Sequence, residues 1–205
     1  MPANFFNPYF LGLVIFAVMY LRLCNNDSNL TGNKHFENGE YQLALEHYDE
    51  YLMLYPEDVK TRYNRGRCLE SLGKNDAACR DFEQVLQLDP HNTKATLSLS
   101  QHHFHKAEFK SALLYANYAV QLDKKSALGY YYQARANHKL GYFNEALSAY
   151  NTAIELDPEF GFAYFQRSSL LLSIGLRPLG CYDLRMAQSL HVQGAAEALD
   201  LYCKN

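Results

Sequence analysis

Four histidines are the residues of this 205-residue chain that come nearest to a metal site. His102 and His105 lie three residues apart and would share one face of a helix, with His103 between them and His138 further along. Histidine nitrogens bind zinc when other ligands complete the set, but no carboxylate or cysteine stands at a recognised spacing from them. We therefore interpret these histidines as solvated or groove-lining side chains, and we expect no metal and no other cofactor.

The cysteines are a second group that could carry chemistry. Their number is odd, and no two of them form a CxxC pair of the kind that binds metals or exchanges disulfides. We interpret them as reduced residues that serve in packing, on a reducing side of a membrane. The five cysteines are Cys24, Cys68, Cys79, Cys181 and Cys203.

No catalytic motif appears elsewhere in the chain. There is no nucleophile elbow, no phosphate-binding loop and no paired-carboxylate pattern. We therefore expect that the protein is not an enzyme and that it binds no small-molecule substrate. The net charge of -3 argues against a nucleic-acid partner held by global charge.

The elements that position these residues are clearest between Ala127 and Phe160. Small and aromatic residues recur there at three- and four-residue spacing, as on one face of a helix. Gly141 separates two such helices, and Pro158 ends the second because proline lacks the N–H that would continue it. A unit of this size cannot bury its apolar face alone, which predicts that it repeats.

The unit does repeat, without a gap in its 34-residue register. The turn glycine recurs in four copies, and alanine replaces it in the third. A small residue of the second helix and a leucine near its end recur in the same way. The turn positions are Gly39, Gly73, Ala107, Gly141 and Gly175; the small residues are Ala44, Ala78, Ala112, Ala146 and Gly180; the leucines are Leu54, Leu88, Leu122, Leu156 and Leu190.

This helix–turn–helix pattern resembles the tetratricopeptide repeat (TPR). The resemblance implies an all-α fold: a right-handed superhelical solenoid of about five repeats, with an apolar helix before it and a capping helix after it. The predicted domains are an N-terminal transmembrane or docking helix over 1–24, repeats over 25–58, 59–92, 93–126, 127–160 and 161–192, and a capping helix over 193–205.

The first 24 residues differ in kind from the rest. Tyr9 to Leu21 has no strongly polar side chain, and extension to residues 5–24 reaches membrane-spanning length. A signal peptide usually has basic residues before its apolar run, but here none precedes the run. Arg22 follows it instead. We expect an uncleaved single-pass membrane anchor with the repeats on the cytoplasmic side. An apolar helix that docks on a partner protein is the alternative.

The resemblance also implies a concave groove, lined by the first helix of each repeat, that binds protein segments. Its middle would be basic and its C-terminal end aromatic, which suits a segment with acidic residues and an apolar side chain. An ordinary solvated helix face is the alternative. Carried across by register, the groove residues are Asn33, Asn64, Arg67, Lys94, Phe104, Tyr131, Arg135, His138, Lys139, Phe162 and Phe165.

Chaperone-binding members of the family hold a C-terminal carboxylate with lysine, asparagine and arginine side chains. Asn33, Asn64 and Lys94 match three of those positions in this chain. Asn29 and Ser98 replace two of the cations, and a carboxylate needs such charged donors. The match to a carboxylate clamp is therefore partial.

Together these observations predict a membrane-tethered scaffold or adaptor that binds a protein segment in its groove. Tethering would raise the local concentration of the bound partner. Two alternatives stay open: an accessory subunit or assembly factor of a membrane protein complex, and a chaperone-docking receptor that uses the partial clamp.

Overall fold

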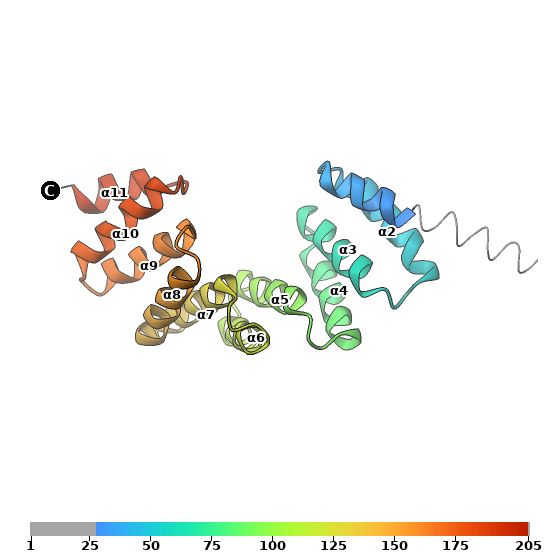
Figure 1. Ribbon diagram of the computed structural model, residues 1–205, viewed down its shortest axis with the longest axis horizontal. Helices are drawn as coiled ribbons and strands as arrows, with labels where there is room; N and C mark the ends of the chain where they lie inside the picture. The colour runs from blue at the N-terminus through green and yellow to red at the C-terminus, as the bar shows by residue number, and fades with distance from the viewer. Residues whose placement is uncertain (1–27, 205) are drawn as a thin grey trace, which may run out of the picture. The chain divides into compact units, whose positions relative to one another are not determined.

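The computed structural model describes residues 28–204, and every regular element in that range is an α-helix (Figure 1). The all-helical class is therefore confirmed for this part of the chain. No helix within it is long and apolar enough to cross a membrane. The predicted anchor over 1–24 lies outside the described residues and stays a prediction.

Helices follow one another in pairs joined by tight turns, with the period that the sequence predicts. The first described helix covers residues 28–37 and precedes α2. The labelled helices are α2 (Tyr41–Leu54), α3 (Val59–Ser71), α4 (Asn75–Leu88), α5 (Thr93–His105), α6 (Phe109–Leu122), α7 (Ala127–Leu140), α8 (Phe143–Leu156), α9 (Gly161–Ser173), α10 (Arg177–Ser189) and α11 (Ala195–Cys203).

Short polar side chains define where three of the first helices begin. Asp58 accepts a hydrogen bond from the backbone N–H of Thr61, and Asn92 does the same for Ala95 ahead of α5. Ser126 caps α7 in the same manner. Each bond satisfies an N–H that the first helical turn leaves without a partner.

The turn inside each pair needs a residue with positive φ. Gly141 ends α7 at φ 81°, a conformation that glycine adopts without a steric penalty. In the third pair Ala107 takes the same conformation at φ 59°, where its Cβ is unfavourable. Ala107 therefore introduces local backbone strain at this turn, but the helix pair keeps its fold.

The chain divides into two compact units, and the first ends at Pro90. Its described part holds the helix over 28–37 and α2, α3 and α4, packed around fully buried Tyr48 and Phe82. A Cβ added to Gly66 would lie 2.6 Å from the Phe82 ring. The small residue therefore lets the aromatic ring pack against the α3 backbone.

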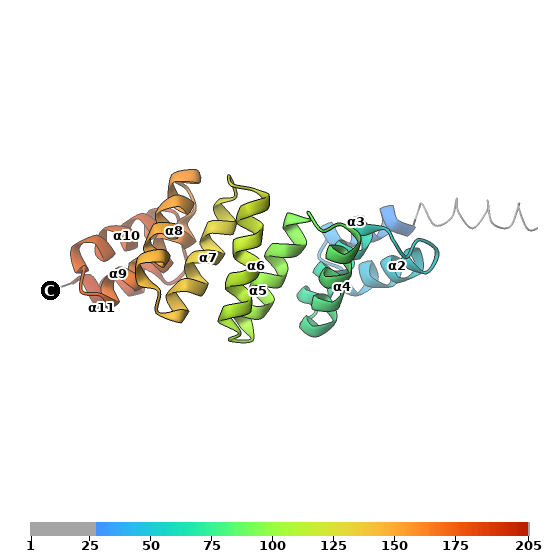
Figure 2. The same cartoon turned by 90° about the horizontal axis from the view of Figure 1, so that it is seen from below.

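The second unit begins at His91 and contains α5 to α11. Figure 2 shows α5, α6, α7 and α8 as neighbours in chain order. A core of alanines around buried Tyr150 joins α7, α8 and α9, and it extends through Ala187 and Ala195 to α10 and α11. These small side chains allow close helix approach, and the aromatic rings fill the remaining space.

The structure corrects the prediction that all cysteines are reduced. Cys181 of α10 and Cys203 of α11 form a disulfide, with Cα atoms 5.7 Å apart. Their separation of 22 residues carries no pairing motif; α11 folds back on α10 and brings them together. Cys68 is a buried free thiol and Cys79 is buried as well, in agreement with a packing role for both.

Candidate protein-binding face

The candidate site is built on the first helices of three successive pairs in the second unit. α7 contacts both α5 and α9, so these helices form one row. A hydrogen bond from Tyr132 Oη to Gln101 Oε1, 2.8 Å long, links α7 to α5. We call the partly or fully exposed side chains of this row the first-helix face, namely Phe104, Arg135, His138, Lys139, Phe162 and Phe165.

Arg135 and Phe104 meet at the centre of the first-helix face. The Arg135 guanidinium carbon lies 4.0 Å from the centroid of the Phe104 ring, a cation–π contact between α7 and α5. Among the described residues no carboxylate pairs with Arg135. Its hydrogen-bond donors therefore remain available to an external anion, while the ring holds the guanidinium in place.

Lys139 and His138 extend the face towards the end of α7. Lys139 is exposed and has no ion pair among the described residues, so α7 presents two unneutralised cations. Burial lowers the pKa of half-buried His138, and the charge of Lys139 lowers it further. His138 packs edge-on against Phe143, and its burial favours the neutral form of the imidazole.

The two phenylalanines of α9 supply the apolar part of the face. Phe162 is 55% exposed, so its ring presents apolar surface to solvent. Phe165 is half-buried and lines a cavity of about 800 Å³ between α9, α10 and α11. The face thus places aromatic surface one helix away from the cations of α7.

Tyr131 does not belong to this exposed surface, in contrast to the prediction. Its side chain is only 8% exposed. Its ring packs against Phe160, with centroids 4.8 Å apart, and against Tyr150. Burial raises the pKa of the Tyr131 hydroxyl. Tyr131 lies on a first helix as the register predicts, but Phe160, just before α9, covers its ring, so Tyr131 is a core residue. The Arg135 guanidinium carbon lies 5.4 Å from the centroid of this ring.

Lys94 is exposed near the start of α5, and the remaining predicted residues lie in the first unit. There Asn33 Oδ1 accepts hydrogen bonds from Tyr48 Oη at 2.8 Å and Asn64 Nδ2 at 3.0 Å. Arg67 forms an ion pair with Glu70 at 3.0 Å. The two clamp asparagines are thus bonded within a polar network of their own unit.

The histidines of α5 make local contacts. His103 Nδ1 lies 2.6 Å from a carboxylate oxygen of Glu108, and its ring stacks on Tyr115. His105 is exposed and its ring meets Phe104 edge-on. In residues 28–204 no three potential ligands come together around a metal-sized space.

Two buried ion pairs escaped the sequence reasoning. Arg167 clasps Asp183 through Nε and Nη2 at 2.7 and 2.8 Å, and its Nη1 donates to Asn151 Oδ1. In the first unit Arg65 makes the same contacts to Asp81 and Asp49. The hydrogen bond to Asp81 raises the pKa of Arg65 above its ordinary value.

The repeat register contained the signal for these pairs, because the equivalent residues stand three periods apart. In the intervening α7, Gln133 occupies the arginine position and donates to Asn117 at 2.8 Å. The aspartate position there is Ala149. The ion pair is therefore present in some repeats, and a neutral hydrogen bond takes its place in another.

Comparisons with known proteins agree with this geometry. The family model described as "Tetratricopeptide repeat" matches residues 32–101, and a second model with the same description matches residues 127–160. Together the two matches cover about half of the chain.

Among curated proteins, the "Hsp70-Hsp90 organizing protein" of Triticum aestivum is 30% identical over 82 residues, which are 40% of this chain and 14% of that protein. "DnaJ homolog subfamily C member 7" of Homo sapiens is 33% identical over 97 residues, 45% of this chain and 20% of that protein. The chain therefore spans at most about a fifth of the length of these relatives.

Solved structures match over more of the chain. "MamA 41-end from Desulfovibrio magneticus RS-1" has a TM-score of 0.74 at 19% identity, covering 82% of this chain and 94% of that one. YrrB, described as "a TPR protein with an unusual peptide-binding site", has a TM-score of 0.67 at 21% identity, covering 84% and 90%. At such identities the likeness shows the fold. The two family matches show that this chain carries tetratricopeptide repeats over residues 32–101 and 127–160.

Proposed function

We propose that the chain is a non-catalytic adaptor whose first-helix face binds a segment of a partner protein. The observation that carries the proposal is the pairing of Arg135 with Phe104 beside unneutralised Lys139. Cations without carboxylate partners attract acidic residues, and exposed Phe162 favours contact with an apolar side chain. The preferred segment is therefore acidic and carries at least one large apolar residue.

The mechanism is stoichiometric binding. The rigid helices hold the cations and aromatic rings at fixed separations, so the partner loses freedom while the face does not. Residues 5–24 would tether the adaptor to a membrane and raise the local concentration of its partner. Disulfides persist in oxidising compartments, and Cys181–Cys203 therefore favours the oxidising side of that membrane over the cytoplasmic side expected from the charges.

Docking to a chaperone is the second candidate, because the matched curated proteins carry chaperone names in their descriptions. Asn33 and Asn64 favour it by position. The hydrogen bond between them and the replacement of two clamp cations by Asn29 and Ser98 weigh against it. An acidic segment on the second unit therefore remains the better supported partner.

Selection from a randomised peptide display library on the immobilised full-length chain tests the proposal. We expect peptides rich in Asp and Glu around one large apolar residue. Reversal of both cations, Arg135→Glu with Lys139→Glu, should weaken binding of the selected peptides by about tenfold or more in fluorescence anisotropy.

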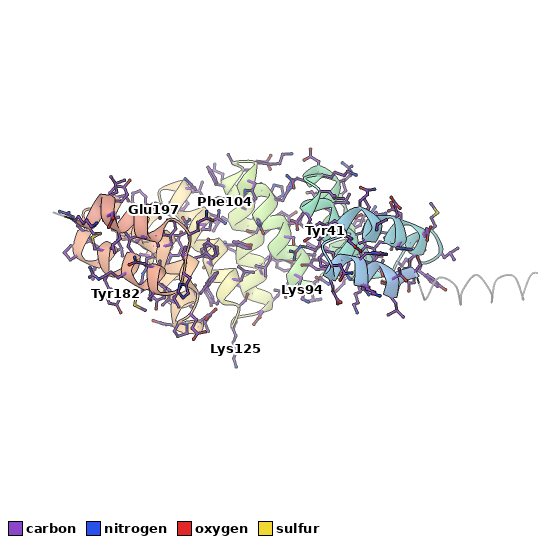
Figure 3. All side chains as sticks on the ribbon, turned by 90° about the horizontal axis from the view of Figure 1, so that it is seen from above. Tyr41, Lys94, Phe104, Lys125, Tyr182 and Glu197 are labelled. Atoms are coloured by element: carbon purple, nitrogen blue, oxygen red, sulfur yellow. A yellow bond between two sulfur atoms is a disulfide. The ribbon has the colours of Figure 1, made fainter. Side chains whose placement is uncertain are left out.

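The matched control reverses two charges away from the face, Lys124→Glu with Lys125→Glu. Figure 3 shows Lys125 projecting away from the helices at the turn between α6 and α7. The control should bind like the wild type, and far-UV circular dichroism should be the same for all three proteins. Unchanged binding after reversal of the α7 cations would show that the face is not the site.

A further inference from the structure

The cavity behind Phe165 opens beside the first-helix face, and three helices form its walls. α9 supplies Phe165, Ser169 and Leu172, α10 supplies Leu184, and α11 supplies Ala198 and Tyr202. Its volume of about 800 Å³ lies in the range of pockets that enclose ligands. Phe165 belongs both to the face and to the cavity, so the two share this side chain.

The α11 wall has little apolar packing of its own. α11 has nine residues, and Ala195 is its only buried residue. Leu201 is 71% exposed and Tyr202 is 51% exposed. So short a helix is marginal in water unless other contacts hold it.

Covalent and polar contacts hold the C-terminal end of α11 in place. The Cys181–Cys203 disulfide joins it to α10. Arg177 Nε donates to the carbonyl oxygen of Tyr202 at 2.9 Å, and Arg177 Nη2 donates to that of Lys204 at 3.4 Å. We call these contacts the α11 clasp. They fasten the end of α11 that carries Tyr202, one of the residues that line the cavity.

We propose that this cavity takes a large apolar side chain of the acidic segment bound on the first-helix face, and that the α11 clasp keeps its outer wall in place. The inference rests on the proposed function and deepens it. Arg135 and Lys139 lie on α7, which contacts α9. Acidic residues of the segment can therefore reach these two cations while the apolar side chain beside them occupies the cavity.

Two fluorescein-labelled acidic peptides test the inference on the full-length chain, one with a central phenylalanine and one with serine in its place. The wild type should bind the phenylalanine peptide about tenfold more tightly or better, because the ring is removed from water. Ser169→Phe, at an exposed position of the cavity wall, should occupy the part of the cavity next to Phe165 and reduce this preference. Ala198→Phe should narrow the cavity from the α11 side and have the same effect.

The clasp is tested with Cys203→Ser and with dithiothreitol. Either change should reduce the preference for phenylalanine at least threefold while the serine peptide binds as before. Dithiothreitol should have no further effect on Cys203→Ser, which separates the clasp from buried Cys68 and Cys79. Faster hydrogen exchange in α11 should accompany the loss.

Equal binding of the two peptides to the wild type would overturn the inference. If that binding still falls on reversal of Arg135 and Lys139, the proposed function stands without the cavity. If neither peptide binds the wild type, the proposed function and the inference fail together. If both Ser169→Phe and Ala198→Phe still prefer the phenylalanine peptide as strongly as the wild type does, the phenylalanine binds outside this cavity and the inference is wrong.

Discussion

Replacement of Arg167 by alanine is expected to be among the most damaging single changes in the second unit. Asp183 is 1% exposed, and its two carboxylate oxygens are held by Arg167 Nε and Nη2 at 2.7 and 2.8 Å. Arg167→Ala leaves this carboxylate buried without its cation. The arginine side chain is itself only 17% exposed, so water cannot readily replace the guanidinium.

The size of the effect follows from desolvation. A buried ion pair adds little net stability, but removal of one partner strands a charge, which costs about 3 to 5 kcal/mol. The bond from Arg167 Nη1 to Asn151 is lost as well. We therefore expect the free energy of unfolding to fall by about 3 to 5 kcal/mol, a large share of the stability of an ordinary domain.

Urea denaturation followed by far-UV circular dichroism measures this change, and hydrogen exchange of α9 and α10 locates it. The control is Gln133→Ala, at the equivalent position of α7, where a neutral bond to Asn117 is lost instead. That change should cost only about 1 kcal/mol. Arg167→Lys should fall between the two, because lysine keeps the charge and loses the two-pronged geometry.

A double variant separates the stranded charge from lost packing. Arg167→Met with Asp183→Leu removes both charges and keeps similar volume, and it should be much more stable than Arg167→Ala. If Arg167→Ala costs no more than Gln133→Ala, or if the double variant is the less stable of the two, the explanation by a stranded buried charge is wrong.

Three further predictions concern the turn after α5, a buried thiol and a histidine. Ala107→Gly should stabilise the chain by about 1 kcal/mol, because glycine adopts φ 59° without a steric penalty. Gly141→Ala should destabilise it by a similar amount, and the thermal unfolding midpoints of the two variants test both expectations. Burial raises the pKa of the Cys68 thiol to about 11, so iodoacetamide at pH 8 should alkylate it only after unfolding, as mass spectrometry will show; fast labelling of the folded chain would contradict this. Burial lowers the pKa of His138 in the folded chain, so the unfolded chain binds a proton at this residue more readily. The stability that neutral His138 provides is fully present above the unfolded pKa of about 6.5, and it is lost as the pH falls towards the lower folded pKa. The free energy of unfolding of His138→Gln should therefore decrease less between pH 7 and pH 5 than that of the wild type, and parallel curves would refute the assignment.

Local features of this molecule were predictable from the sequence, because each depends on a few neighbouring residues. The 34-residue register placed the helix pairs, since small and aromatic residues recur on one helical face. Gly141 marks a turn that needs positive φ, and Asp58 marks a helix start through its own hydrogen bond. The register also placed Arg135 and Phe104 on first helices, where the structure brings them together.

Contacts between distant residues were decided only by the tertiary structure. Tyr131 has the register of a groove residue, yet the chain before α9 places Phe160 over its ring and makes it core. Cys181 and Cys203 become partners because α11 folds back on α10, which no local pattern specifies. A repeat sequence states which residues face a neighbouring helix, but the three-dimensional packing determines which atoms meet there and which surface stays open to a partner.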